Sequence, residues 1–109
     1  MSTSEFKGEM SAGEITAVFR ADFSNDSSAL LSMAFSSVGG GNSLTSHDTA
    51  TPGGVAHASL TLDEKGILEV WVVVGSDTES GRLTVSRNGE VSDDDATKGS
   101  TRWAYAIVP

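Results

Sequence analysis

The segment 39–54, GGGNSLTSHDTATPGG, sets three residues of the types used in hydrolytic triads side by side: Ser46, His47 and Asp48. In a triad the histidine bridges the serine and the acid across space, and adjacency along the chain does not supply that geometry. The chain also has no G-x-S-x-G elbow to expose a serine nucleophile. We therefore interpret the tripeptide as part of a polar, water-facing loop and assign no catalytic residue.

Metal binding by the two histidines is a second chemical hypothesis. His47 and His57, with Asp48 or Glu69, would supply two imidazoles and a carboxylate, a set that suits several divalent metals. The histidines are ten residues apart, which matches no metal-ligand spacing, and the chain has no third histidine. We expect two ordinary surface histidines, and no metal or other cofactor.

Two further patterns offer ion-binding groups without the spacing that ions need. The aspartates 93–95 supply carboxylates of the kind calcium prefers, but a calcium loop separates its acids and adds a turn glycine. We expect a solvated acidic loop over residues 92–100. The glycines 39–41 would suit a phosphate cradle, yet no Lys-Ser or Lys-Thr pair follows them, so we reject phosphate binding there.

Composition narrows the classes of partner. The chain has 109 residues, with 15 acidic and seven basic side chains and a net charge of −8. Nucleic-acid binders concentrate positive charge, whereas the arginines here are scattered, so we expect neither nucleic acid nor an anionic membrane as a partner. No cysteine is present, which excludes disulfides and thiolate metal sites. No apolar run is long enough to predict membrane insertion.

The compartment stays open between the cytoplasm and export. The first residues, MSTSEFKGEMSAGE, have neither the basic start nor the apolar run of a signal peptide. A chain without disulfides fits the cytoplasm, but exported proteins can also lack them.

Alternation of apolar and polar residues predicts an all-β fold. Residues 14–22, EITAVFRAD, alternate as a strand does. Residues 29–38 suit a helix by propensity and by the glycine that follows them, but their period-two alternation favours a strand. Asn88-Gly89 is a strong signal for a hairpin, with Arg87 and Glu90 paired across it.

We therefore predict a single domain over residues 1–109. It is a small antiparallel β-sandwich, or a partly open barrel, of six to seven short strands, with one short helix near 28–37 as the alternative for that segment. Residues 1–12 are expected to be loosely ordered.

The segment 55–75 predicts another hairpin, because two β-rich runs flank DEKG. A three-residue loop at 64–66 sets Gly66 at the left-handed position of a bulged turn, where glycine is favoured. In that register the inward pairs are all apolar: Leu62 with Leu68, Leu60 with Val70, Ala58 with Val72, and Ala56 with Val74. The opposite face then carries Trp71 beside Ser59, with His57 and Glu69 near them.

Trp71 carries the functional hypothesis. An aromatic ring beside hydrogen-bonding side chains suits sugars and also protein interfaces. The alternative is that residues 67–74, ILEVWVVV, form a strand buried on both faces, within the domain or in a homo-oligomer. We assign Trp103 and Tyr105 to the core.

We expect a non-enzymatic recognition module, lectin-like in the loose sense, that binds a carbohydrate or a protein. The segment 39–54 is expected to be a mobile loop at the rim of the Trp71 face, with a short strand at 43–46 as the alternative. The candidate ligand-binding residues are Trp71, His57, Ser59, Glu69, Asn42, His47 and Asp48.

The alternative function is a self-assembling structural protein, a virion or surface component, that buries residues 67–74 between identical chains. A small hydrolase or metal-dependent enzyme ranks third.

Overall fold

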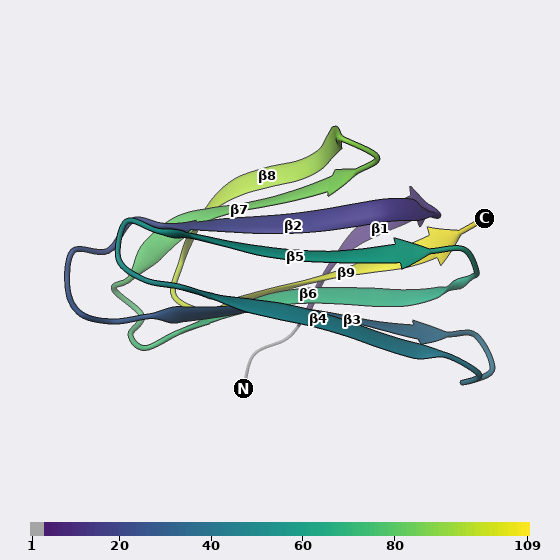
Figure 1. The fold of residues 1–109 in the computed structure, drawn as a ribbon, viewed down its shortest axis with the longest axis horizontal. Coiled ribbons are helices and arrows are strands. Elements are labelled where there is room, and N and C mark those ends of the chain that lie inside the picture. The colour runs from purple at the N-terminus through teal and green to yellow at the C-terminus, as the bar shows by residue number, and fades with distance from the viewer. Residues whose placement is uncertain (1–3) are drawn as a thin grey trace.

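Nine β-strands in two facing sheets form the fold of the computed structural model, which describes residues 4–109 (Figure 1). The predicted all-β sandwich is confirmed, with more strands than the six or seven expected. Residues 4–109 contain no helix, and therefore none with the length and apolarity needed to cross a membrane. The strands are β1 (Glu5–Ser11), β2 (Gly13–Ala21), β3 (Ala29–Ser37), β4 (Ser43–Ala50), β5 (Val55–Leu62), β6 (Gly66–Val74), β7 (Ser80–Arg87), β8 (Glu90–Lys98) and β9 (Thr101–Val108).

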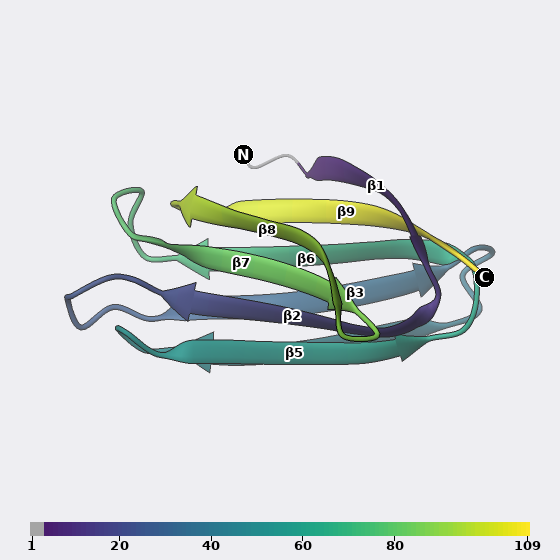
Figure 2. The same cartoon turned by 90° about the horizontal axis from the view of Figure 1, so that it is seen from above.

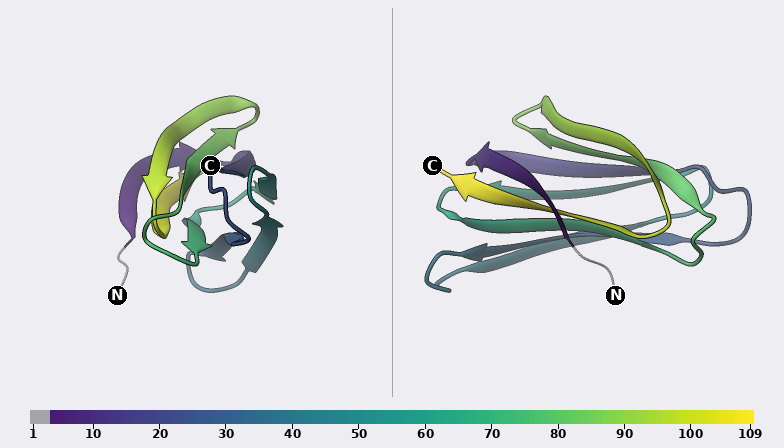
Figure 3. Two further views of the ribbon diagram at one scale, coloured as in Figure 1. Left: turned by 90° about the vertical axis from the view of Figure 1, so that its left-hand side faces the viewer. Right: turned by 180° about the vertical axis from the view of Figure 1, so that it is seen from behind.

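The strands divide into a five-stranded sheet, in the order β1-β9-β6-β3-β4, and a four-stranded sheet, in the order β5-β2-β7-β8. Seen from above, the four-stranded sheet lies in front of the five-stranded sheet (Figure 2). Neighbouring strands are antiparallel except β1 and β9, which run parallel. The end-on view shows the two layers, with β8 curving over one side (Figure 3).

The core lies between the sheets because apolar residues alternate along each strand. A side chain on a strand points to the face opposite that of its neighbours, so every second residue enters the core. The expectation that residues 29–38 are a strand is confirmed by β3. The inward residues of β2, β3 and β9 are almost completely buried: Ile15, Ala17, Phe19, Leu31, Met33, Phe35, Trp103, Tyr105 and Ile107.

The predicted hairpin between residues 55–62 and 66–74 is wrong. β5 pairs with β2, β6 pairs with β3 and β9, and residues 63–65 therefore cross from one sheet to the other. Leu62 and Leu68, which we matched across a ladder, are both buried but belong to opposite sheets. Two strands that face each other across the core bury matching apolar residues, just as two hydrogen-bonded strands of one sheet do. The apolar pattern alone therefore does not show which strands are paired.

Three segments that we expected to be loose or looped are strands. Residues 5–11 form β1, and residues 90–98 form β8 in place of the acidic loop. Residues 43–50 form β4 in place of the mobile loop, which confirms the alternative of a strand at 43–46 and extends it. Each of the three lies at the edge of a sheet. Charged and polar residues suit edge strands because they discourage pairing with the strands of other chains. The polar composition of these three segments, which suggested loops, therefore reflects their position at the edges of the sheets.

The Asn88-Gly89 hairpin is confirmed. Arg87 opposes Glu90 across the turn, and Asn88 and Gly89 have φ angles of 50° and 85°, as a type I′ turn requires. Asn88 also ties the turn to β2, because its backbone N–H donates to the Glu14 carbonyl at 2.7 Å and its Oδ1 accepts from the Glu14 N–H at 2.9 Å.

Candidate functional site

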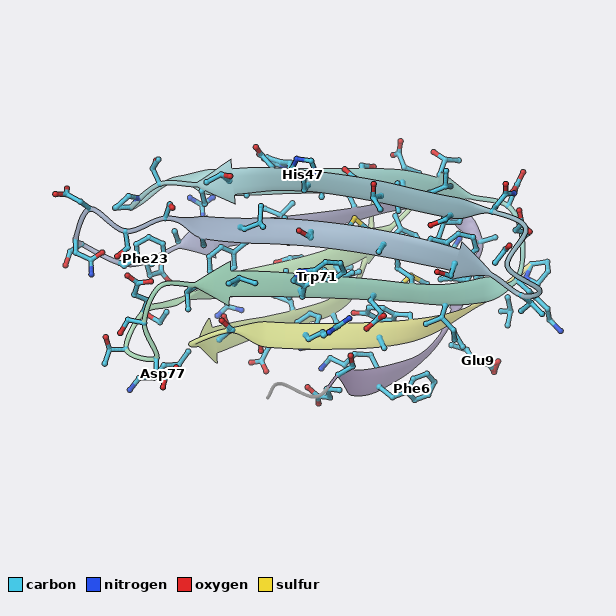
Figure 4. All side chains as sticks on the ribbon, turned by 90° about the horizontal axis from the view of Figure 1, so that it is seen from below. Phe6, Glu9, Phe23, His47, Trp71 and Asp77 are labelled. Atoms are coloured by element: carbon cyan, nitrogen blue, oxygen red, sulfur yellow. The ribbon has the colours of Figure 1, made fainter. Side chains whose placement is uncertain are left out.

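Trp71 faces outward from the middle of the five-stranded sheet. On β6 the inward residues are Leu68, Val70 and Val72, so Trp71 and its alternate neighbours point away from the core. A cross-strand row runs through Trp71, which stands opposite Ser32 on β3 and Arg102 on β9. Ser32 in turn stands opposite His47 on β4, and Figure 4 shows His47 and Trp71 on this face.

Exposed apolar side chains gather on the same side of the sheet. Phe6 is 64% exposed, Leu30 40%, and Ile67 and Val73 49% each. Phe6 lies opposite Ala104 and forms the β1 edge of this surface (Figure 4). Small side chains fill the spaces between the large ones. We call this surface the apolar face and define it by Phe6, Leu30, Ile67, Trp71 and Val73 with the small residues Ser32, Ala34, Ala104 and Ala106.

One ion pair lies within the apolar face. Arg102 Nε is 2.8 Å from Glu69 Oε2, and the Arg102 guanidinium lies 5.2 Å from the centre of the Trp71 ring. The Nε–H bond makes no aligned hydrogen bond, so attraction between the charges, rather than hydrogen bonding, joins Arg102 to Glu69. The Ser4 hydroxyl donates to the same Glu69 oxygen at 3.0 Å. The charges at the centre of the face therefore balance.

The outer face of the four-stranded sheet is polar by contrast. Its outward residues on β5, β2 and β7 are mainly hydroxyl-bearing or charged: His57, Ser59, Thr61, Thr16, Val18, Arg20, Arg82, Thr84 and Ser86. His57 and Ser59, expected beside Trp71, lie on this second face because β5 belongs to the other sheet. Of the candidate ligand-binding residues, only Trp71, Glu69 and His47 lie on the outer face of the five-stranded sheet.

Asp48 and Ser46 join the two sheets along the β4–β5 side of the sandwich. The His57 N–H donates to Asp48 Oδ2 at 3.0 Å, and the Ser59 N–H donates to Ser46 Oγ at 3.1 Å. The backbone N–H of His57, followed by that of Thr49, lowers the pKa of the Asp48 carboxyl below its ordinary value. These side chains satisfy N–H groups on an edge strand, which is a structural role.

The Ser46-His47-Asp48 tripeptide lies on a strand, which separates its side chains. Ser46 and Asp48 point toward β5, whereas His47 points outward beside Ser32. A histidine on the opposite side of the strand cannot bridge its two neighbours as a triad requires. Within residues 4–109 there is no group of three or more histidine and acidic side chains arranged to hold a metal ion.

Asn42 lies in the β3–β4 connection, at one end of the sandwich. Its N–H donates to Ser37 Oγ at 2.8 Å, and its side-chain amide donates to Glu64. Ser37 is five residues along β3 from Ser32, which is about 16 Å in a strand. Asn42 therefore links two connections between strands and does not adjoin Trp71.

The aspartates 93–95 lie on β8, where their side chains alternate and do not converge on a cation. The Tyr105 hydroxyl donates to Asp93 at 2.9 Å, and Lys7 Nζ lies 4.0 Å from Asp93 and 4.4 Å from the centre of the Trp103 ring. On the other side of the strand, Asp94 accepts from Arg82 at 2.9 Å, which lowers the pKa of the Asp94 carboxyl.

Sequence reasoning missed most of the apolar face. The alternation of residues 67–74 predicted that Ile67, Glu69, Trp71 and Val73 lie on one side of a strand, and β6 confirms this prediction. Phe6, Leu30 and Arg102 come from strands whose order in the sheet is not written in the sequence. The described residues enclose no pocket, so the apolar face is an open surface and not the wall of a cleft.

Comparison of the chain with protein-family models, with curated proteins and with solved structures finds no match in any of the three.

Proposed function

We propose that this chain is a non-enzymatic recognition module that binds a flat, largely apolar protein surface through the apolar face. The observation that carries the proposal is the gathering of Phe6, Leu30, Ile67 and Val73 around Trp71 on one sheet face, while the other outer face is polar. Contiguous exposed apolar surface on a small protein commonly marks a contact with another protein. Tryptophan and arginine at the centre of such a surface are the residues enriched where binding energy concentrates.

Carbohydrate binding is the second candidate, because the Trp71 ring lies among hydrogen-bonding groups from Glu69, Arg102 and His47. Sugars stack on aromatic rings beside such groups. The Arg102 guanidinium already lies over the Trp71 ring and covers part of the surface on which a sugar would stack. A protein ligand, which uses the aliphatic residues as well, ranks first for that reason.

The chain contains no cysteine, so a single introduced thiol reports on one position. We would prepare Val73→Cys on the apolar face and Val18→Cys on the outer face of the four-stranded sheet as its matched control. Both are valines on strands interior to their sheets. Maleimide labelling rates would be measured in dilute pure protein, in concentrated pure protein, and in a concentrated extract of the cells that make the chain.

Thiols in the extract consume maleimide and slow labelling at every position, so the rate at position 73 is read relative to that at position 18. The proposal predicts a lower ratio of these two rates in at least one of the two concentrated samples than in the dilute sample, and an unchanged ratio in all three samples would overturn it. A set of defined oligosaccharides added to the dilute protein tests the second candidate, since bound sugar would slow labelling at position 73 and change Trp71 fluorescence.

A further inference from the structure

We infer that the protein covering the apolar face is a second copy of this chain, packed face to face about a two-fold axis. This inference rests on the proposed function, because it names the partner of the same surface. Three properties of the face support it: the relief of its side chains, its area and its charge.

The side chains of the apolar face are complementary to the same face of a second copy around Ile67. Ile67, Trp71 and Val73 project from β6 in the middle of the sheet, with Glu69 between Ile67 and Trp71. The outward residues of β9 and β3 near Ile67 are small, namely Ala104, Ala106, Ala34 and Ser36, whereas Arg102 and Leu30 are the large outward residues farther along these strands. In a two-fold pairing about an axis parallel to the strands and offset by about one strand spacing, β6 of each copy lies over β9 of the other, so that Ile67 meets Ala106 and Trp71 meets Arg102. Interdigitation of this kind is how two sheets pack into a sandwich core.

The face is large enough for a weak dimer. In a pairing offset by one strand, four of the five strands of each copy overlap, and at the usual spacing with eight residues of strand length this gives a surface about 19 Å by about 27 Å, or about 500 Å² for each copy. Two such surfaces total about 1,000 Å², the size at which a specific interface becomes plausible and below the standard range of about 1,200–2,000 Å². Affinity depends on the fit of the two surfaces as well as on their area, so the expected dimer is weak.

The charge of the face also suits a second copy. In a two-fold dimer the same face of both copies comes into contact, so a face with an excess of positive or negative charge would be repelled by the same face of the other copy. Glu69 and Arg102 are already paired at 2.8 Å and enter the interface together, which leaves no unpaired charge at its centre. The acidic strand β8 belongs to the other sheet, so a face-to-face dimer keeps the β8 carboxylates of both copies apart. Glu9, exposed on the edge strand β1 opposite Ala106, is the acidic residue at the rim of the face.

Sedimentation equilibrium of the whole chain tests the inference, with Val73→Lys on β6 and Val18→Lys as the matched control. Val73 is 49% exposed, so a lysine fits there without entering the core. We expect wild type and Val18→Lys to dimerise at about 100 µM, and Val73→Lys to raise the dimer dissociation constant at least about tenfold. Ile67→Lys, at the other end of β6, is the second variant, and circular dichroism confirms that each variant folds.

A wild-type chain that remains monomeric at about 1 mM would overturn the inference, as would a Val73→Lys variant that dimerises like wild type. The labelling experiment then separates the two proposals. If the chain is monomeric but position 73 is protected in the cell extract, the second copy is wrong and the recognition function stands. If position 73 is never protected, both are wrong.

Discussion

Tyr105 is the only tyrosine in the chain, so its ionisation can be followed by ultraviolet absorbance without interference from another phenol. Burial, and then the hydrogen bond to Asp93, raise the pKa of the Tyr105 hydroxyl far above its ordinary value of about 10. The neutral phenol is favoured in the folded state, so its stabilising contribution is complete below about pH 10 and is lost above it. We predict that phenolate absorbance appears only when circular dichroism reports alkaline unfolding. A titration near pH 10 with the fold intact would contradict this.

Tyr105→Phe tests the same contact at neutral pH. The variant keeps the buried ring and removes the hydroxyl that donates to Asp93 at 2.9 Å. Hydrogen bonds to charged groups contribute more than neutral ones, so we expect a loss of about 1–2 kcal/mol in the free energy of unfolding, measured by urea titration. An unchanged urea midpoint would show that the hydroxyl contributes nothing.

Asp48 gives a pH dependence of the opposite sign. Its pKa is lowered in the folded state, so its contribution to stability is present above about pH 4 and disappears as the pH falls through the folded value. We predict that Asp48→Ala lowers the urea midpoint at pH 7 and that the difference from wild type narrows toward pH 2.5. Asp63→Ala, which removes an exposed carboxylate, is the control. A difference that persists at low pH would mean that packing, not charge, is responsible.

Gly66 is required by close approach of the backbone. A Cβ at this position would overlap the Ser36 carbonyl oxygen and the ring of Phe35, neither of which can move freely in the core. We predict that Gly66→Ala lowers the free energy of unfolding by about 1–3 kcal/mol, the usual cost of overpacking. Gly41→Ala is the matched control, because the nearest atom to a Cβ there is Ser37 Oγ at 3.9 Å. Equal stability of the two variants in urea would refute this role for Gly66.

At the scale of elements, the β7–β8 hairpin depends on Asn88. Asn88 adopts a φ of 50°, which asparagine tolerates better than most residues, and its Oδ1 accepts from the Glu14 N–H. Asn88→Ala loses both advantages, and we expect a cost of about 1–2 kcal/mol in thermal or urea unfolding. Asn88→Asp keeps an acceptor oxygen and tolerance of this φ, and should recover most of the loss. Equal losses in the two variants would count against the hydrogen bond.

The element scale also shows what the sequence could and could not predict. Alternation in residues 29–38 and 67–74 correctly predicted strands and their inward faces, because burial of one face is a local property of the pattern. The pairing of β5 with β2 was not predictable, since residues 56–62 offer the same apolar pattern to any strand of the fold. The polar edge strands β4 and β8 were interpreted as loops because their residues show no alternation of apolar and polar side chains, although each pairs with the strand that precedes it in the sequence.

The candidate site was recovered only in part, for the same reason. Trp71 and Glu69 share a strand, so the sequence alone puts them together. Arg102 and Leu30 join them through the order of β9, β6 and β3. His57 and Ser59 were wrongly placed beside Trp71 because the placement relied on a hairpin that does not form. Residues joined by one strand are predictable, whereas residues joined by sheet order are not.

For the whole molecule, the net charge of −8 predicts how self-association responds to salt. Two chains of like charge repel at long range, while the apolar face contributes attraction that salt does not screen. We predict that raising the sodium chloride concentration from about 20 mM to about 500 mM lowers the dimer dissociation constant measured by sedimentation. Weaker association at high salt would instead indicate a contact held by ion pairs.

The most direct test of the face-to-face dimer is an isotope-filtered NOE spectrum of a mixture of labelled and unlabelled chains at a concentration where the dimer forms. Such a spectrum records only contacts between copies. We predict cross-peaks from the Ile67 side chain of one copy to the Ala106 methyl group of the other, and from the Trp71 ring of one copy to the Arg102 side chain of the other. The absence of intermolecular cross-peaks, or cross-peaks confined to β8 or to the outer face of the four-stranded sheet, would contradict the account.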